Sequence, residues 1–266
     1  MAMNDQNRPA DWKHFDDFAA GIATNRLPVT DALRGQTFKI TLKTGRTIDL
    51  AFTAADTVAW SEGAEAGADW YEALEVAPHV FFINMTFVAR PAEDEAFIVD
   101  TKTRRVLSVR ERVREPGEAQ GEPRVAQTYS AGVLGDPAVP PTGREPAPTR
   151  DLIGLTAHYT YSPNHVYEHI YLSSQRYAWQ NLVGVQRGHG DVDLATTWKF
   201  AENLYVFGFR EFIIPVASLF FYNWDTMRST GKFLGVTSQG KVENKPAGAF
   251  IEKKSRAVYD AGQEPV

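Results

Sequence analysis

The amino-acid sequence contains an internal duplication, and this repeat limits the folds that the chain can adopt. Residues 30–60 align with residues 149–179 without a gap, and seven of the 31 aligned positions are identical. The identical pairs are Thr30/Thr149, Leu33/Leu152, Gly35/Gly154, Thr37/Thr156, Thr41/Thr160, Ala59/Ala178 and Trp60/Trp179. Because the unit occurs only twice, the repeat predicts two similar domains rather than a solenoid.

Both copies alternate with period two, which is the pattern of a strand with one buried face. The alternating positions of the first copy are apolar: Phe38, Ile40, Leu42, Ile48, Leu50, Phe52, Val58 and Trp60. The same positions of the second copy are mostly phenols, with one imidazole: Ala157, Tyr159, Tyr161, Tyr167, His169, Tyr171, Tyr177 and Trp179. Burying polar groups costs free energy unless they meet partners or a ligand. The pattern therefore predicts a filled core in the first domain and a site in the second.

Composition excludes several classes of protein. The chain has no cysteine, so disulfides, zinc–thiolate sites, iron–sulfur clusters and a cysteine nucleophile are ruled out. A net charge of −5 argues against a nucleic-acid partner, because phosphate binding needs a basic excess. No apolar run is long enough to span a membrane, and the polar residues 1–10 lack the apolar core of a secretory signal. These features predict a cytoplasmic protein without nucleic-acid or membrane partners, and they leave open whether it forms a homodimer.

Short alternating segments separated by turn residues run through both halves of the chain. Helical spacing of aromatic residues predicts one short helix in a lead-in over residues 1–30. The alternating segments favour a closed antiparallel meander over residues 31–115 and another over residues 150–266. Residues 116–149 hold seven prolines and are predicted to be an inter-domain connector. The expected fold is all-β, with two tandem antiparallel β-barrels and a short N-terminal helix.

Glu211 is a candidate acid–base residue. It lies in the aromatic segment Phe209-Arg210-Glu211-Phe212, and an ungapped alignment of residues 69–107 with 196–234 places Asn84 opposite it. Arg210 and Glu211 are neighbours, so only one of them faces the barrel interior, and the sequence leaves open which. An inward carboxyl among aromatic rings would have a raised pKa and could donate a proton near neutral pH. The alternative is an ion pair on the outer face.

Tyr159, Tyr161 and Arg187 are candidates for holding a carboxylate or carbonyl group. The two phenols share one face of a strand, about 7 Å apart, and could converge on one oxygen, although barrel tyrosines also pack their rings and turn the hydroxyl to a rim. Arg187 lies in the glycine-containing loop 184–190 and could clamp a carboxylate, or it could be an ordinary solvated arginine.

The histidines suggest a metal site, but their spacing does not support one. His158, His165, His169 and His189 lie near Asp191 and Asp193 without forming a known metal-binding motif, so no metal is expected. Neither a phosphate-binding glycine loop nor a dinucleotide fingerprint is present, so no cofactor is expected. His169 has inward parity, which leaves a role as acid, base or phenol partner open.

The segment Tyr159-Thr-Tyr-Ser-Pro-Asn-His-Val-Tyr167-Glu-His-Ile-Tyr171 resembles the opening hairpin of bacterial phenolic acid decarboxylases, which are single calycin-type barrels. In that family two tyrosines hold the substrate carboxylate, an arginine helps to orient the substrate and a glutamate handles the proton. The resemblance places these roles on Tyr159, Tyr161, Arg187 and Glu211, in the same order along the chain.

The whole chain also resembles the MoaF family, through the segments from Tyr177 to Leu182, from His189 to Asp193 and from Phe209 to Pro215. That family is named for molybdenum cofactor biosynthesis, and its two-domain lipocalin-like layout implies calycin-like barrels here. It also leaves an accessory role in molybdenum cofactor metabolism as one alternative.

We therefore expect a cofactor-free lyase of decarboxylase type that acts on a small phenolic or aromatic acid through a quinone methide. The predicted catalytic residues are Glu211, Tyr159, Tyr161 and Arg187. The predicted substrate-binding residues are Tyr167, His169, Tyr171, Tyr177, Trp179 and Phe209. A non-catalytic barrel that binds a small aromatic molecule is the other alternative.

Overall fold

The computed structural model describes residues 9–266, so the first eight residues of the predicted lead-in lie outside the described part. The chain divides into two units. One unit comprises Leu27–Arg112 and Gln127–Ala147, and the other comprises the described chain up to Arg26, Val113–Ala126 and Pro148–Val266. The described chain has no helix with the length and apolarity of a membrane span.

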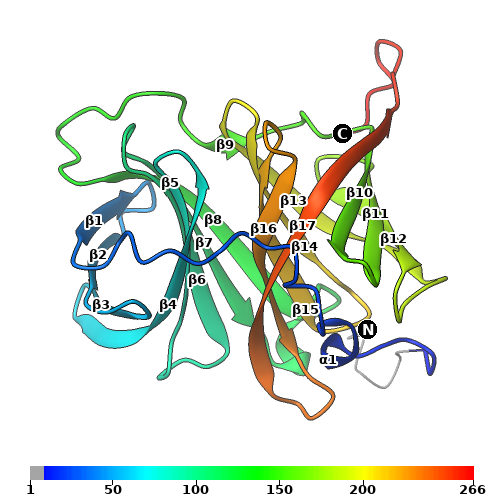
Figure 1. Cartoon of the computed structure of the whole chain (residues 1–266), viewed down its shortest axis with the longest axis horizontal. Helices are drawn as coiled ribbons and strands as arrows, with labels where there is room; N and C mark the ends of the chain where they lie inside the picture. The colour runs from blue at the N-terminus through cyan, green and yellow to red at the C-terminus, as the bar shows by residue number, and fades with distance from the viewer. Residues whose placement is uncertain (1–8) are drawn as a thin grey trace. The chain divides into compact units, whose positions relative to one another are not determined.

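The first barrel is a closed antiparallel meander, in which each strand pairs with the next and β1 returns to β8 (Figure 1). Its strands are β1 (Thr37–Leu42), β2 (Thr47–Phe52), β3 (Thr57–Glu62), β4 (Glu65–Ala77), β5 (Val80–Thr86), β6 (Glu93–Asp100), β7 (Arg105–Val113) and β8 (Val125–Leu134). A 3₁₀ turn, η2 (Pro116–Glu118), follows β7.

The second barrel repeats this arrangement. Its strands are β10 (Leu155–Ser162), β11 (His165–Tyr171), β12 (Arg176–Val183), β13 (Gly190–Ala201), β14 (Leu204–Arg210), β15 (Val216–Asn223), β16 (Arg228–Val236) and β17 (Val242–Arg256). Pairing of β10 with β17 and of β12 with β13 closes the ring, and the short β9 (Ala147–Pro148) is added beside β13. The predicted all-β fold with two antiparallel barrels and one short helix is therefore confirmed.

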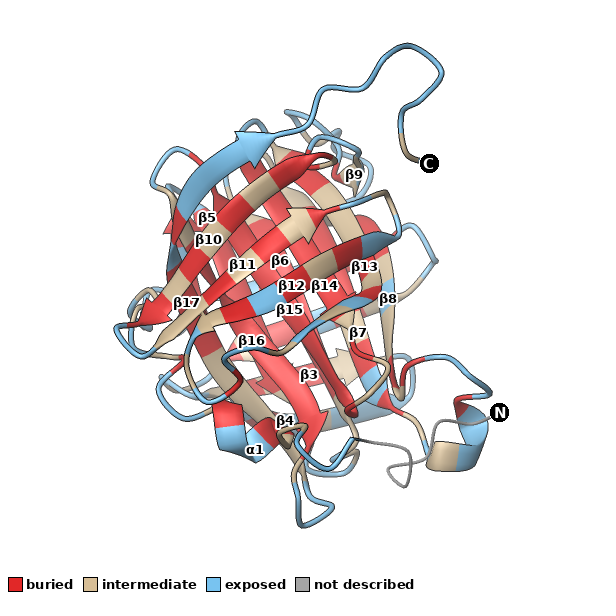
Figure 2. Cartoon of the chain, turned by 90° about the vertical axis from the view of Figure 1, so that its right-hand side faces the viewer, coloured by how far each residue is buried: buried red, intermediate tan, exposed pale blue. Residues whose placement is uncertain are grey.

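The predicted inward positions of both copies are buried. All sixteen side chains of the two alternating sets are at most 9% exposed, and Figure 2 shows buried and less buried residues alternating along β10 and β11. The register is also the same in the two copies, because β1 and β2 pair Ile40 with Ile48 where β10 and β11 pair Tyr159 with Tyr167. The duplicated sequence thus gives two duplicated hairpins with different linings.

The later strands of the repeat correspond in a register that the ungapped alignment misses. In the first barrel Thr57 pairs with Trp70, and in the second barrel the corresponding residue Arg176 pairs with Leu194. On the next pair of strands, Tyr71 pairs with Met85 in the first barrel, and Ala195 pairs with Phe209 in the second. This register makes Phe87 the counterpart of Glu211, since each directly follows its strand, β5 or β14. The alignment of Asn84 with Glu211 was therefore wrong. Strand pairing decides which residues of the two barrels correspond, and the ungapped alignment is displaced by three residues from this correspondence.

The proline-rich segment 116–149 is only partly a connector. Its residues Val125–Leu134 form β8, which pairs with β1 and closes the first barrel. Proline cannot donate a ladder hydrogen bond, and all the prolines of this segment lie outside β8. The proline count of the whole segment concealed a strand that is itself free of proline.

Residues 9–26, which we call the N-terminal strap, belong to the unit that contains the second barrel. The strap includes the helix α1 (Phe15–Phe18), whose two phenylalanines are buried in the core of that barrel. The Asn25 amide donates to the Tyr161 carbonyl at 3.1 Å, and the Gly248 amide donates to the Ile22 carbonyl at 3.1 Å. The predicted helix therefore exists, and backbone hydrogen bonds attach the strap to β10 and β17.

We expect Gly248→Ala to loosen the strap, because a Cβ at this position would lie 2.4 Å from the Arg26 Cα. The backbone would have to separate there, so the strap amides should exchange faster with solvent deuterium. The new Cβ would also lie 2.9 Å from the Ser229 carbonyl oxygen, so amides of β16 and β17 close to it should respond as well, whereas strands away from this contact should change little. Hydrogen exchange followed by mass spectrometry measures this. Gly117→Ala is the control, since nothing lies within 4 Å of its Cβ. Unchanged strap exchange in Gly248→Ala would contradict the close contact.

Candidate functional site

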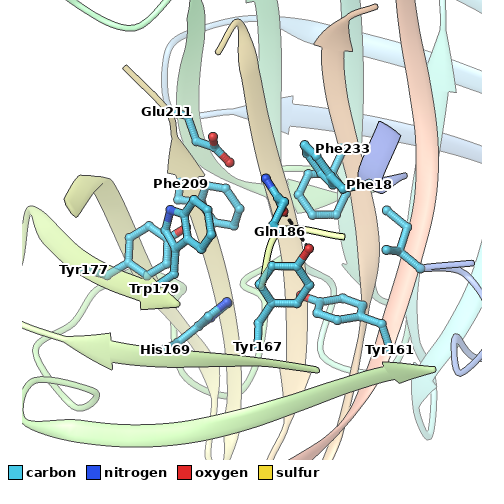
Figure 3. A pocket seen from close by; sticks show the side chains of 11 residues that line it. Phe18, Tyr161, Tyr167, His169, Tyr177, Trp179, Gln186, Phe209, Glu211 and Phe233 are labelled. Atoms are coloured by element: carbon cyan, nitrogen blue, oxygen red, sulfur yellow. Dashed lines mark hydrogen bonds between the residues drawn. The ribbon is translucent and has the colours of Figure 1, made fainter. Parts of the chain in front are cut away.

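A cavity of about 30 Å³ lies inside the second barrel (Figure 3). Its wall is mainly aromatic and includes one carboxyl, one amide and one imidazole. The lining residues are Phe18, Ile22, Tyr161, Tyr167, His169, Tyr177, Trp179, Gln186, Phe209, Glu211 and Phe233. Phe18 and Ile22 come from the N-terminal strap, Gln186 from the β12–β13 loop and Glu211 from the segment directly after β14, and the barrel strands supply the others. The cavity lies where the sequence placed a site.

The cavity is smaller than an aromatic ligand. A cavity that accepts benzene has about 150 Å³, whereas 30 Å³ holds roughly two water molecules. An aromatic molecule would therefore need side chains to move. The strap side chains Phe18 and Ile22 lie outside the barrel strands, so they can move without breaking a strand ladder.

Several of the inward phenols bond to one another and do not face the cavity. The Tyr159 and Tyr171 hydroxyls lie 2.5 Å apart, and Tyr171 donates to Tyr222 at 3.2 Å. Burial raises the pKa of all three phenols, so they stay protonated. Tyr159 and Tyr171, which were predicted to contact a substrate, are therefore in the packed interior and absent from the lining of the cavity.

Gln186, rather than Arg187, extends from the β12–β13 loop into the barrel. The Tyr167 hydroxyl donates to Gln186 Oε1 at 2.7 Å, and Gln186 is only 1% exposed. Arg187 is exposed and does not line the cavity, so the predicted clamp with Tyr159 and Tyr161 is not assembled. The loop has no periodic pattern from which the sequence could show which of the two neighbours turns inward.

Glu211 is the carboxyl that lines the cavity, which resolves the choice between it and Arg210. Glu211 is 6% exposed, whereas Arg210 donates to Thr196 Oγ1 at 3.0 Å on the other side of the strand. Burial raises the pKa of Glu211 well above its usual range, and the negative charges of Asp193 and Asp191 raise it further. Both effects favour the protonated form of Glu211, which is the direction that the sequence predicted for an inward glutamate.

Asp193 is a second buried carboxyl beside Glu211. It accepts hydrogen bonds from Trp179 Nε1 at 2.9 Å and from the Phe212 amide at 3.1 Å. Burial raises the pKa of Asp193 to about 7, and its two hydrogen bonds oppose this effect. Since Glu211 lacks those two donors, the first proton of the pair belongs on Glu211 and the negative charge on Asp193.

The first barrel contains the same tryptophan–aspartate pair without the second carboxyl. Trp60 Nε1 donates to Asp69 Oδ2 at 2.7 Å, and the Val88 amide donates to Asp69 Oδ1 at 2.9 Å. At the position of Glu211 the first barrel has Phe87, whose ring packs on Trp60 at 5.4 Å. The pair is thus a structural feature of both barrels, and the acid at position 211 is specific to the second.

The other titratable residues of the predicted site are distributed as follows. His169 lines the cavity, burial lowers its pKa to about 3, and the imidazole is neutral. The remaining histidines of the second barrel have other partners: His158 pairs with Glu168, His165 with Ser162 and His189 with Asp11. Among residues 9–266 no group of three or more histidine, aspartate or glutamate side chains is arranged to hold a metal ion.

We expect Glu211→Gln to change how stability depends on pH. The folded state keeps the Glu211 proton, whereas the unfolded chain releases it above a pKa of 4.5, so the wild type loses stability as pH rises from about 4.5 through the raised pKa. The free energy of unfolding of Glu211→Gln, relative to the wild type, should therefore increase between pH 5 and pH 8. Each unit by which the pKa is displaced corresponds to about 1.4 kcal/mol. Urea unfolding at several pH values measures this difference in the free energy of unfolding. A difference that stays constant with pH would contradict a buried acid at Glu211.

His169→Leu should act on the acid side, because the first barrel has Leu50 at this position. The folded state excludes the proton that an unfolded histidine binds below pH 6.5, so the wild type loses stability as pH falls from 6.5 toward 3. By pH 5 the loss should be about 2 kcal/mol, and His169→Leu should lack it. Urea unfolding at pH 7 and pH 5 tests this, and parallel losses in the two proteins would be evidence against a neutral buried imidazole.

Comparison with known proteins agrees with the two-domain organisation. Residues 10–115 match the MoaF N-terminal domain, and residues 146–257 match the MoaF C-terminal domain. Protein MoaF of Klebsiella aerogenes is 44% identical over 109 residues, which is 40% of this chain and 42% of that protein. A putative beta-lactamase from Burkholderia vietnamiensis has a TM-score of 0.34 and 10% identity over 39% of this chain and 95% of that chain, a level that carries no information on function. The matched domains lie in order and together cover most of the sequence, and the chain belongs to the MoaF family.

Proposed function

We propose that the second barrel is the active site of a cofactor-free lyase that acts on a small phenolic molecule, with Glu211 as the residue that exchanges a proton with it. The observation that carries the proposal is the buried acid of Glu211 at the position where the first barrel has Phe87. A buried carboxyl is costly to keep without a function, and an apolar residue suffices at this position in the sister barrel.

The two carboxyls can divide the proton chemistry between them. Burial and the nearby aspartates favour the protonated form of Glu211, whereas the two hydrogen bonds of Asp193 favour its charged form. Glu211 can release its proton to a carbon of the substrate side chain and recover one later, which is what a general acid and base must do. Neighbouring carboxyls whose pKa values are driven apart are a known basis for such a division of roles.

A para-hydroxyl on the substrate would remove the need for a cofactor. When the phenol loses its proton and the side-chain carbon gains one, the ring becomes a quinone methide. Cleavage of the bond to a small fragment then returns an electron pair to the ring and restores its aromaticity. Loss of carbon dioxide or formaldehyde, hydration and double-bond migration can all pass through this intermediate, so the acid–base role of Glu211 is common to all of them.

The aromatic wall supports a ring-shaped substrate. The ring centroids of Tyr177 and Phe209 lie 4.9 Å apart, and those of Phe209 and Phe233 lie 5.9 Å apart in an edge-to-face arrangement. The cavity therefore presents both ring faces and ring edges. A ligand ring can join this arrangement with the same offset or edge-on geometry. A non-catalytic binding protein is the second candidate, and the mutual hydrogen bonds of Tyr159 and Tyr171 favour it because they leave those phenols no role in chemistry.

We expect Glu211→Gln to lower turnover by about 10²–10⁴-fold, the usual contribution of a general acid or base. Ligand affinity should change little, because glutamine keeps the shape and hydrogen-bonding groups of the protonated acid. Ultraviolet spectra recorded with a panel of hydroxycinnamates and lignin-derived phenols measure turnover, and calorimetry measures binding. Glu168→Gln is the control, since Glu168 pairs with His158 outside the cavity. Unchanged turnover in Glu211→Gln would rule out the acid–base role, and binding without turnover across the panel would favour the carrier.

A further inference from the structure

We infer that the cavity of the second barrel takes an uncharged phenolic alcohol or carbonyl compound in preference to the corresponding carboxylate. The inference rests on the proposed function and deepens it, because it names the class of substrate. It depends on three features of the site: the charges of the cavity wall, the polar atoms that the wall leaves without partners, and the arginines that lie outside the wall.

The charges of the site oppose an anion. No lysine or arginine is among the residues that line the cavity, and the histidine there is neutral because burial lowers its pKa. The buried ionisable neighbours are instead the carboxyls of Glu211 and Asp193. A carboxylate that entered would lose its hydration, meet no cation and be repelled by the charge on Asp193. An uncharged oxygen does not meet these costs.

The arginines around the site do not compensate for this, because none of them lines the cavity. Arg187 is exposed and absent from the cavity wall, although it lies directly after Gln186. Arg176 is also exposed, and its guanidinium lies over the Phe212 ring at 5.3 Å. Its charge acts on Asp193 from outside the cavity and lowers the pKa of that carboxyl. Arg176 therefore favours the ionised form of Asp193, which increases the repulsion of a second anion.

Two buried polar atoms of the wall are available to an uncharged ligand. Among residues 9–266, Gln186 Nε2 and His169 Nδ1 are buried atoms without a hydrogen-bond partner. The Gln186 amide is held by Tyr167 at its oxygen, so its nitrogen is left as a donor, and Figure 3 shows it on the side of the amide away from Tyr167. Leaving such groups unsatisfied costs free energy. A hydroxyl or carbonyl oxygen accepts from an amide without bringing a charge.

Binding of matched ligand pairs tests the inference. Calorimetry of the full chain at pH 8, above the pKa of about 7 of Asp193, would compare coniferyl alcohol with ferulate, and 4-hydroxybenzyl alcohol with 4-hydroxybenzoate. Within each pair the phenol ring is shared, and the side chain ends in a neutral CH2OH group in one member and in a carboxylate in the other. We expect the alcohol to bind at least tenfold more tightly in each pair. Gln186→Leu should weaken binding of the alcohol severalfold, because it removes the amide donor.

Asp193→Asn tests whether the charge on Asp193 repels a carboxylate ligand, and the equivalent aspartate of the first barrel supplies the control. Removing the charge on Asp193 should narrow the preference for the alcohol, whereas Asp69→Asn removes the equivalent aspartate of the first barrel and should leave the preference unchanged. A carboxylate that binds the wild type as tightly as its alcohol would overturn the inference while leaving the proton role of Glu211 intact. Failure of both members of both pairs to bind would overturn the inference and the proposed function together.

Discussion

A closed barrel excludes water from its inward side chains, so every polar group placed there must find a partner inside. The second barrel meets this requirement in groups. Three phenols bond to one another, Tyr167 bonds to Gln186, and Trp179 bonds to Asp193. The acid of Glu211, the Gln186 amide nitrogen and the His169 Nδ1 atom belong to residues of the cavity wall and take part in none of these bonds. The candidate site is therefore the part of a polar interior that the protein does not satisfy by itself.

The duplication allows structure and function to be separated within one chain. Both barrels have the tryptophan–aspartate pair at the same register, so this pair alone does not indicate chemistry. The barrels differ at the residue beside it, where Phe87 packs on Trp60 in one and Glu211 faces a cavity in the other. The same comparison applies to Leu50 and His169. At each of these positions the first barrel shows that an apolar residue is sufficient for the fold.

The sequence was sufficient for the barrels and their inward faces, because strand periodicity fixes which side chains share a face. It named Glu211 as a candidate acid but left open whether Glu211 or Arg210 faces the cavity, and the structure decides this. The sequence failed where periodicity is absent. The loop between β12 and β13 has no alternating pattern, so the sequence could not show that Gln186, and not Arg187, faces the barrel interior. The prolines on either side of β8 concealed this strand. That Phe87 is the counterpart of Glu211 follows only from the pairing of β4 with β5 and of β13 with β14. Hydrogen bonds among Tyr159, Tyr171 and Tyr222 depend on three separate strands, which no local pattern links.

The N-terminal strap limits which ligands can occupy the small cavity, because a ligand larger than the cavity must displace Phe18 of the strap. Phe18 belongs to the wall, and exposing a phenylalanine of this kind costs about 1.5–3 kcal/mol. A ligand that displaces it must offset this by burying comparable apolar area against the rings of the wall. A small polar molecule cannot do so, because its hydrogen bonds with the wall only replace those it had with water. An aromatic ring can, since it restores the contacts that Phe18 gives up and leaves its polar end to the unsatisfied nitrogens.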